Sequence, residues 1–335
     1  RRRRGGEVQL FQFGLDGGDV GIHHLLQQAD LQDVELLAAL AEGVPFRGVK
    51  GTTGTQASYL ALFEGDGEKV EELERKVAAK MDFERVFPVT GQTYTRKFDL
   101  KVLSHLAGLG ASAHKMAVDV RLLAGAKELE EPFGKKQVGS SAMAYKRNPM
   151  RCERMTALSR FVMNNAQNAA FTAADQWLER TLDDSANRRL SLAEGFLAAD
   201  SICRLLANIS SGLVVNRAVV NSRLEKELPF MATENILMEA VKAGGDRQEL
   251  HERVRQHSMA AAEQVKSKGA DNDLLDRIRN DPAFAAIKDR VDEIVSAEKF
   301  IGRAPEQVRT FVREDVLPVL EQFEGEQDVE TKLRV

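Results

Sequence analysis

The chain has 335 residues, of which 43% are hydrophobic and 29% charged, and its 47 basic and 51 acidic side chains give a net charge of −4. These values are typical of a soluble globular protein with two or three subdomains, and they argue against a disordered chain or one that binds nucleic acid. No apolar run approaches the ~20 residues of a membrane-spanning helix, so we expect a cytoplasmic protein without membrane contact whose partner is a small metabolite.

The cysteines and histidines show no arrangement typical of a metal site. Cys152 and Cys203 have no paired spacing and no neighbouring histidine ligands. This pattern predicts a reducing compartment, no disulfide framework and no bound zinc. The six histidines likewise include no pair at metal-ligand spacing within a motif, so we expect no metal.

The first 45 residues differ from the rest of the chain. Four arginines, a glycine-rich stretch and a glutamine pair make no consistent amphipathic pattern. We expect 1–45 to be an atypical segment, either disordered or the remnant of a garbled reading frame. The arginine run is too short, on a net acidic chain, to predict a nucleic-acid site.

From about residue 56 onward the apolar pattern is helical nearly everywhere. One apolar stripe runs from Lys97 to Gly125 over roughly eight turns, and it comprises Leu100, Leu103, Leu106, Leu109, Ala113, Met116, Val120 and Leu123. Two more long helices are predicted at about 150–177 and 187–213. Helices of this length favour an elongated bundle whose remaining apolar faces are buried against other subunits, so we expect oligomerisation and assign 46–215 to a central long-helix bundle.

After Pro229 the predicted helices become shorter and are separated by glycine and proline turns. We therefore assign 216–335 to a smaller C-terminal helical domain with a frayed acidic tail. The predicted fold class is all-α, a long-helix bundle with this smaller domain.

The loop from Gly139 to Pro149 reads G-S-S-A-M-A-Y-K-R-N-P and combines a Gly-Ser-Ser turn with a cation and an amide. A serine is a base only if nearby positive charge and N–H groups stabilise its alkoxide. Lys146 is the local cation, and Lys146 and Asn148 are donors suited to a carboxylate that gains a second charge when the adjacent carbon loses a proton. A Gly-Ser-Ser stretch alone would indicate only a flexible linker.

Two further polar segments are candidates for substrate binding. In 177–189 a turn rich in capping residues opens a helix with arginines in its first turns, which suits an oxygen-rich dianion, although the spacing alone favours a plain helix cap with exposed arginines. Gln92 lies in a polar turn before the longest helix, where a glutamine is more often structural. The run 51–56 is interpreted as a structural turn bordering the site.

Together these motifs resemble the adenylosuccinate lyase family of the fumarase/aspartase superfamily. The loop is similar to the family's substrate-covering G-S-S-x-M-P-x-K-x-N-P loop, with Ala144 in place of proline, and 177–189 is similar to its phosphate-binding segment nearly letter for letter. The resemblance extends from about Phe46 to about Leu320. It implies the all-α bundle, homotetramers with active sites shared between subunits, and no metal or organic cofactor.

The resemblance also implies a reaction and a set of roles. The family eliminates fumarate from adenylosuccinate to leave AMP, and from the succinyl-carboxamide ribotide SAICAR to leave AICAR, in purine synthesis. Ser140, the first serine of the pair, would be the general base. Glu153 would support the site or merely complement a helix N-terminus. The implied catalytic residues are Ser140, Lys146 and Glu153, and the implied substrate-binding residues are Gln92, Asn148, Arg154, Arg180, Ser185 and Arg189.

The chain departs from the family at its start. The family's general acid is the histidine of a T-H-x-Q-P-A motif, and this chain has no such motif; His23 and His24 lack its context. We therefore expect a missing or garbled N-terminal domain and weak or no turnover by this chain alone. The alternatives are an inactive truncated paralogue that serves as a structural partner, and another lyase of the superfamily such as argininosuccinate lyase.

Overall fold

The computed structural model describes residues 28–134, 142–143, 145–178 and 180–323. The described chain divides into two compact units, one comprising 28–214 with 318–323 and the other 215–317. Regular structure is almost entirely helical, which confirms the predicted all-α class. None of the helices described is both long and apolar enough to cross a bilayer.

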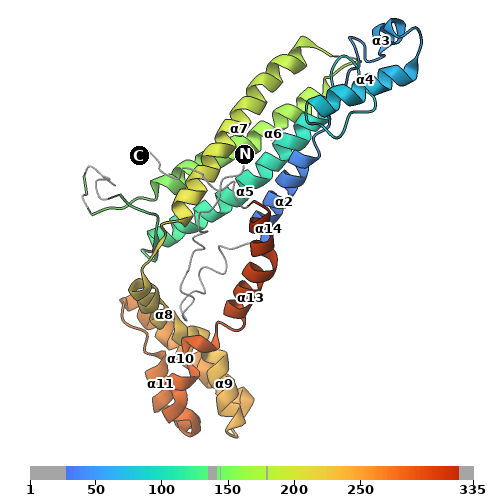
Figure 1. Cartoon of the computed structure of the whole chain (residues 1–335). Coiled ribbons are helices and arrows are strands. Elements are labelled where there is room, and N and C mark those ends of the chain that lie inside the picture. The colour runs from blue at the N-terminus through green and yellow to red at the C-terminus, as the bar shows by residue number, and fades with distance from the viewer. Residues whose placement is uncertain (1–27, 135–141, 144, 179, 324–335) are drawn as a thin grey trace. The chain divides into compact units, whose positions relative to one another are not determined.

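Three long helices, α5, α6 and α7, lie side by side and form the body of the first unit (Figure 1). Their bounds are Lys97–Gly125 for α5, Met150–Ala174 for α6 and Leu182–Ser210 for α7. Helix α6 runs antiparallel to both α5 and α7. Asn165 Nδ2 of α6 donates to the Ser191 carbonyl of α7 at 2.6 Å, and Thr172 pairs with Asn187 at 3.3 Å.

The apolar stripe of α5 forms the centre of this bundle. Leu103, Leu106, Ala113 and Val120 are buried, as the sequence pattern predicts. The opposing helices contribute Met155, Val162, Ile202, Leu205 and Ile209. Gly195 allows α7 to approach closely, because an added Cβ there would lie 2.9 Å from Leu103 Cδ2 and 3.0 Å from Asn165 Nδ2.

The bounds of α6 and α7 differ from the predicted ones. Helix α6 ends at Ala174, three residues before the predicted end. Helix α7 begins at Leu182, five residues before the predicted start, because the Thr181 hydroxyl accepts the Asp184 N–H as an N-cap. The apolar periodicity of α7 becomes regular only after this polar first turn, so periodicity alone places its start too late.

Helix α2, Gln28–Glu42, lies inside the segment 1–45, for which the sequence pattern predicts no helix. It packs against α5, and the Ser112 hydroxyl donates to Asp33 at 2.6 Å. Packing against α5 supplies the stability that the weakly amphipathic sequence of α2 does not provide by itself. The remainder of that segment, 1–27, lies outside the described residues.

The shorter elements of the first unit are α3, Ala57–Leu62, and α4, Gly67–Lys80. A buried ion pair between Lys50 and Glu74, 2.8 Å long, ties α4 to the chain that precedes α3. Two-residue strands, β1 at Leu129–Glu130 and β2 at Val214–Val215, form a small sheet. The predicted domain boundary, between 215 and 216, lies next to β2.

The second unit consists of helices shorter than the three of the bundle, packed around its own apolar core. Phe284, Ile236, Leu274 and Ile287 are among its fully buried side chains. Its elements are α8 Arg217–Met231, α9 Thr233–Lys242, α10 Arg247–Lys268, α11 Leu274–Asn280, η1 Pro282–Arg290, α12 Val291–Ile294, η2 Ala297–Lys299, α13 Ala304–Phe311 and η3 Val312–Val316. Helix α14, Leu317–Gln322, follows them and belongs almost wholly to the first unit. Gly269, at φ 62°, ends α10 in the left-handed conformation that glycine favours.

Candidate functional site

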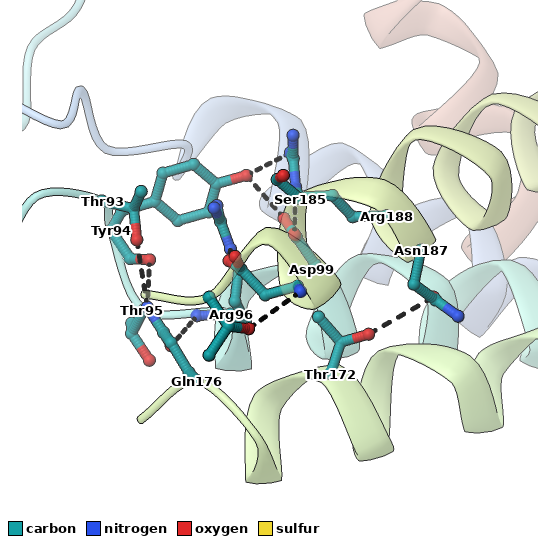
Figure 2. A network of polar contacts seen from close by, with 12 residues as sticks. Thr93, Tyr94, Thr95, Arg96, Asp99, Thr172, Gln176, Ser185, Asn187 and Arg188 are labelled. Carbon is teal, nitrogen blue, oxygen red and sulfur yellow. Dashed lines mark hydrogen bonds and ion pairs between the residues drawn. The ribbon is translucent and has the colours of Figure 1, made fainter. Parts of the chain in front are cut away.

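A polar network joins the turn before α5 to the first turns of α7 (Figure 2). Arg96 Nε donates to Asp184 Oδ2 at 2.5 Å, and the two side chains are 5% and 0% exposed. The Arg96 guanidinium also lies 4.9 Å from the centroid of the Tyr94 ring, a cation–π distance. Two segments 88 residues apart in the sequence are therefore held together by a buried ion pair.

A second connection lies one turn further along α7. The Tyr94 hydroxyl donates to Asp99 at 2.7 Å, while Arg188 donates to Asp99 at 2.8 Å and to the Tyr94 oxygen at 2.6 Å. Burial, followed by the hydrogen bond to Asp99, raises the pKa of Tyr94. Burial alone would lower the pKa of Arg188, but Asp99 outweighs it and the pKa is raised. Both groups thus keep their protons, and the three-residue connection persists at neutral pH.

Gln176, in the link between α6 and α7, fixes the turn before α5 from a third side. Its Oε1 accepts the Arg96 backbone N–H at 2.8 Å. Its Nε2 donates to the Tyr94 carbonyl at 2.9 Å and to the Thr93 hydroxyl at 3.2 Å. The backbone of 93–96 is therefore held by a side chain that belongs to a different part of the bundle.

The candidate phosphate segment lies at this end of the bundle. Ser185 is half-buried, and its hydroxyl donates to the Leu182 carbonyl at 3.1 Å. Arg180 and Arg189 are exposed, and Arg189 donates to the Ser185 carbonyl at 3.3 Å. Exposed guanidinium groups beside a helix N-terminus are suited to hold an oxyanion.

Gln92 lies two residues before Tyr94 and is half-buried. The network therefore brings the Gln92 turn and the Ser185–Arg189 turn of α7 to the same end of the bundle. The run 51–56 lies against the Gln92 turn, because a Cβ on Gly54 would lie 1.9 Å from the Thr90 carbonyl oxygen. Arg47 Nη2 donates to the carbonyls of Gly51 and Gly91, at 2.9 and 3.0 Å.

The candidate catalytic residues of the loop lie elsewhere, around the first turn of α6. Lys146, Glu153 and Arg154 are exposed and Asn148 is half-buried. Ser140 lies outside the described residues, so its predicted role as the base stays a prediction. The first-turn residue Glu153 donates its backbone N–H to the Pro149 carbonyl at 2.9 Å.

Glu131 holds the start of α6 in place. Its carboxylate accepts the Arg151 N–H at 3.0 and 3.1 Å and the Cys152 N–H at 3.0 Å. These amides are among those that a helix leaves free at its N-terminus, so Glu131 occupies the place an anionic ligand could take. Burial, followed by the Glu131 charge, raises the pKa of the Cys152 thiol, which therefore stays protonated.

The predicted residues thus occupy two opposite ends of one bundle. Helices α6 and α7 are antiparallel, so the α6 start that carries Glu153 is far from the α7 start that carries Ser185. At 1.5 Å per residue, the 25 residues of α6 span about 37 Å. Within one chain, the segments that carry Gln92, Ser185 and Arg189 lie at one end of the bundle, while Lys146, Asn148, Glu153 and Arg154 lie at the other.

Sequence reasoning missed the residues that connect these segments: Tyr94, Arg96, Asp99, Glu131, Gln176, Asp184 and Arg188. Several stand inside motifs quoted for other residues, but no local pattern indicates contacts between residues that are 20 to 94 positions apart. The one available signal was an excess of charge, since Asp183–Asp184 and Arg188–Arg189 are more charges than a phosphate site requires.

Comparison with known proteins connects this arrangement to a lyase family. Residues 63–164 match the family described as "Lyase", and residues 229–311 match "Adenylosuccinate lyase C-terminus". The chain is 54% identical over 295 residues to adenylosuccinate lyase of Schizosaccharomyces pombe, covering 88% of the chain and 61% of the relative. For the Saccharomyces cerevisiae enzyme the identity is 52% over 306 residues, with coverages of 91% and 64%. The chain thus spans about three fifths of these relatives' length.

Solved structures share the fold at lower identity. A 3-carboxy-cis,cis-muconate lactonizing enzyme from Pseudomonas putida matches with a TM-score of 0.71 at 18% identity, covering 89% of this chain and 62% of that one. A fumarate lyase from Mesorhizobium matches with a TM-score of 0.70 at 19% identity, with coverages of 88% and 63%. At these identities the likeness establishes the architecture alone.

Proposed function

Because the chain belongs to the adenylosuccinate lyase family of the fumarase/aspartase superfamily, we propose that it acts in the elimination of fumarate from adenylosuccinate and SAICAR. The products would be AMP and AICAR. The observation that supports this best is the grouping of Gln92 with Ser185 and Arg189 at one end of the bundle, where a phosphorylated substrate would find its donors. The argininosuccinate lyase alternative is not favoured, since its substrate has no phosphate.

The proposed chemistry is an anti β-elimination. Ser140 removes the proton from the carbon next to a substrate carboxylate, and that carboxylate gains a second negative charge in the intermediate. Lys146 and Asn148 donate to it, which lowers the barrier by stabilising charge that develops during the step. The C–N bond then breaks, and its electron pair leaves with the nitrogen as fumarate forms. That nitrogen must take up a proton, and the histidine that donates it in the family is not found in this sequence.

The substrate phosphate would bind at the other group of residues. Arg180 and Arg189 offer guanidinium donors, and Ser185 offers a hydroxyl at the start of α7. Gln92 would hydrogen-bond the substrate from the adjoining turn. In the Lys146 group, Arg154 would contact the substrate, and Glu153 would support the active site.

We further propose that one active site combines residues from different copies of the chain in a homotetramer. The two groups of residues lie at opposite ends of α6, about 37 Å apart. A single small substrate cannot reach both within one chain. A neighbouring antiparallel copy can place its Lys146 end beside the Ser185 end of the first copy, which makes assembly part of catalysis.

A reducing compartment, the cytoplasm, is the proposed location. Cys152 is buried and Cys203 exposed, and both are free thiols. An exposed thiol is most compatible with the glutathione-reduced interior of the cell.

The test is fumarate release followed by absorbance, with adenylosuccinate as substrate. We expect at most weak turnover from this chain alone, because its sequence lacks the family's T-H-x-Q-P-A motif. Activity that Ser140→Ala abolishes and Arg189→Gln weakens supports the proposal. Because the sites are shared, mixing the Ser140→Ala and Arg189→Gln variants should restore part of the lost turnover, since some sites receive both intact residues. The mixture should show more activity than the sum of the two variants alone.

Two outcomes would oppose the proposal. No turnover at any protein concentration would favour the inactive structural partner. Turnover that Ser140→Ala leaves intact would remove the proposed base. Failure of the mixture, despite mixed tetramers verified by mass, would contradict the shared site while leaving the reaction itself supported.

A further inference from the structure

The Arg96–Asp184 ion pair is a costly feature of this bundle. Both side chains are almost fully buried, and Asp184 Oδ1 has no hydrogen-bond partner in the part of the chain that the structure describes. Desolvating two charges and leaving an acceptor unpaired opposes folding, and a well-packed apolar pair often serves stability better. A contribution to stability alone is therefore a weak explanation for this pair.

The position of the pair suggests another role. Asp184 immediately precedes Ser185, and Arg96 follows Gln92 by four residues. The pair therefore joins the two segments that carry the proposed substrate contacts. Arg188, which immediately precedes Arg189, makes a second connection to Tyr94 and Asp99 at 2.6 and 2.8 Å.

Two connections one turn apart fix the orientation of the start of α7 relative to the turn before α5. A single connection would allow the helix to rotate about it. Asp184 and Arg188 are four residues apart, so they lie on the same face of α7. Because that face is held against the turn before α5, the first turns of α7 have a fixed orientation. The donors that they carry, Ser185 and Arg189, therefore point in a fixed direction. Ser185 and Arg189 are themselves four residues apart and share a neighbouring face (Figure 2 shows Ser185 beside Arg188).

A phosphate dianion requires such alignment. Its binding energy comes from several donors that converge on one group of oxygens, and misplacement of donors by about 1 Å costs orders of magnitude in productive binding. An exposed side chain such as Arg189 is not packed among neighbours that would fix its direction. Their alignment must come from the backbone that carries them.

We propose that Arg96 and Asp184 are positioning residues that hold the first turn of α7 against the Gln92 turn, so that Ser185 and Arg189 meet one substrate phosphate. This inference rests on the proposed function. Neither residue touches the substrate in this arrangement. The Arg188–Tyr94–Asp99 connection supports the same alignment from the next turn.

The experiment compares AMP with adenosine, which differ by the phosphate alone. Affinities are measured by titration calorimetry for the unaltered chain, Asp184→Asn and Ile202→Ala. Ile202→Ala is the matched control, because it creates a cavity at a fully buried position of the same helix without touching the network. The preference for AMP over adenosine is the readout, since general destabilisation weakens both ligands alike.

We expect Asp184→Asn to reduce the preference for AMP about tenfold or more, with the adenosine affinity little changed. Ile202→Ala should retain the preference. Arg96→Lys, which keeps the charge, should retain more of it than Arg96→Gln. If Asp184→Asn does not fold, as judged by circular dichroism, Tyr94→Phe replaces it, because it removes only one hydroxyl, and it should shift the preference in the same direction.

The failures are distinguishable. An unaltered chain that does not prefer AMP has no phosphate site, which overturns the proposed function and this inference with it. If the unaltered chain prefers AMP and folded Asp184→Asn or Tyr94→Phe shows the same preference, the positioning role alone is overturned. A loss of preference in Ile202→Ala equal to that in Asp184→Asn would also overturn it, because the effect would then be general destabilisation.

Discussion

At the scale of single residues, buried carboxylates keep the helix ends of this bundle in place. Asp184 meets an arginine from another segment, and Glu131 accepts backbone N–H groups at the start of α6, twenty residues away. A local N-cap would satisfy the same amides with a residue next to the helix. The distant carboxylate does more, because it also ties the chain after α5 to the start of the next long helix.

Replacing Glu131 by glutamine tests this role. The amide is uncharged, so the N–H groups of Arg151 and Cys152 both lose a charged acceptor, and its NH₂ group would replace one of the two oxygens that accept them. We expect the free energy of unfolding to fall by about 1–3 kcal/mol, measured by urea denaturation.

The thiol of Cys152 gives an independent readout. Burial and the Glu131 charge both raise its pKa, so Glu131→Gln should lower that pKa, although burial keeps it above the ordinary value. In a Cys203→Ser background, iodoacetamide should react faster at a fixed alkaline pH, because the thiolate is the nucleophile. Glu130→Gln is the control. Its carboxylate pairs with Arg147 at 2.8 Å and should leave the Cys152 reaction unchanged. Equal rates in all three proteins would contradict the assignment.

These residues also mark the limit of what the sequence predicts about the site. Ser185 and Arg189 could be identified as candidates because a cap and two arginines stand in one short segment. Asp184 and Glu131 could not, because their function depends on partners 88 and 20 residues away that only the packed bundle brings near. Local motifs reveal groups that bind ligands better than groups that position them.

At the scale of elements, the bounds that the sequence predicted well are those set by apolar periodicity. Helix α5 runs from Lys97 to Gly125, as its stripe predicts. The start of α7 and the existence of α2 were missed, because a polar cap and contact with α5 decide them. The C-terminal helical unit was predicted, but the 3₁₀ geometry of η1 was not.

Element η1 depends on Asp281, which provides a test through pH. Asp281 caps η1 by accepting the Ala283 N–H at 2.9 Å, and it contacts His257 Nε2 at 2.7 Å. Burial alone would raise the pKa of Asp281, but the His257 ring and the Ala283 N–H outweigh it and lower the pKa. A lowered folded-state pKa means stability that is present above the unfolded value of about 3.9 and is lost as the pH falls through the folded pKa.

We therefore expect Asp281→Asn to unfold at a lower temperature than the unaltered chain at pH 6. The difference should begin to shrink below about pH 3.9, where the carboxylate of the unfolded chain becomes protonated, and it should vanish as the pH falls through the lower pKa of the folded chain. Thermal melts across this range measure it. Asp289→Asn, an exposed position in the same element, should change neither the melting temperature nor its pH dependence. A constant difference between pH 6 and pH 3 would contradict the charge-based account.

At the scale of the whole molecule, the bundle leaves apolar side chains exposed along its long helices. On α7, Leu182, Leu190 and Leu197 are 77%, 70% and 63% exposed. Their spacings of eight and seven residues place them on one face. An apolar face of this length is expected to be covered by another protein surface. A second copy of the chain suits the proposed active site, which needs residues from both ends of the bundle.

The last prediction concerns this face. We expect light scattering coupled to size exclusion to give the mass of a tetramer for the unaltered chain, and a smaller species for the double variant Leu190→Glu with Leu197→Glu, since assembly would then bury two unpaired carboxylates. The helical content of the double variant, measured by circular dichroism, should be unchanged, because both side chains face outward. Leu62→Glu is the control, since Leu62 is 71% exposed but lies on α3, away from the long helices. A monomeric unaltered chain, or a double variant of unchanged mass, would contradict assembly through α7. If the assembly is lost, the activity restored by mixing Ser140→Ala with Arg189→Gln should be lost with it, because the two halves of each site would no longer meet.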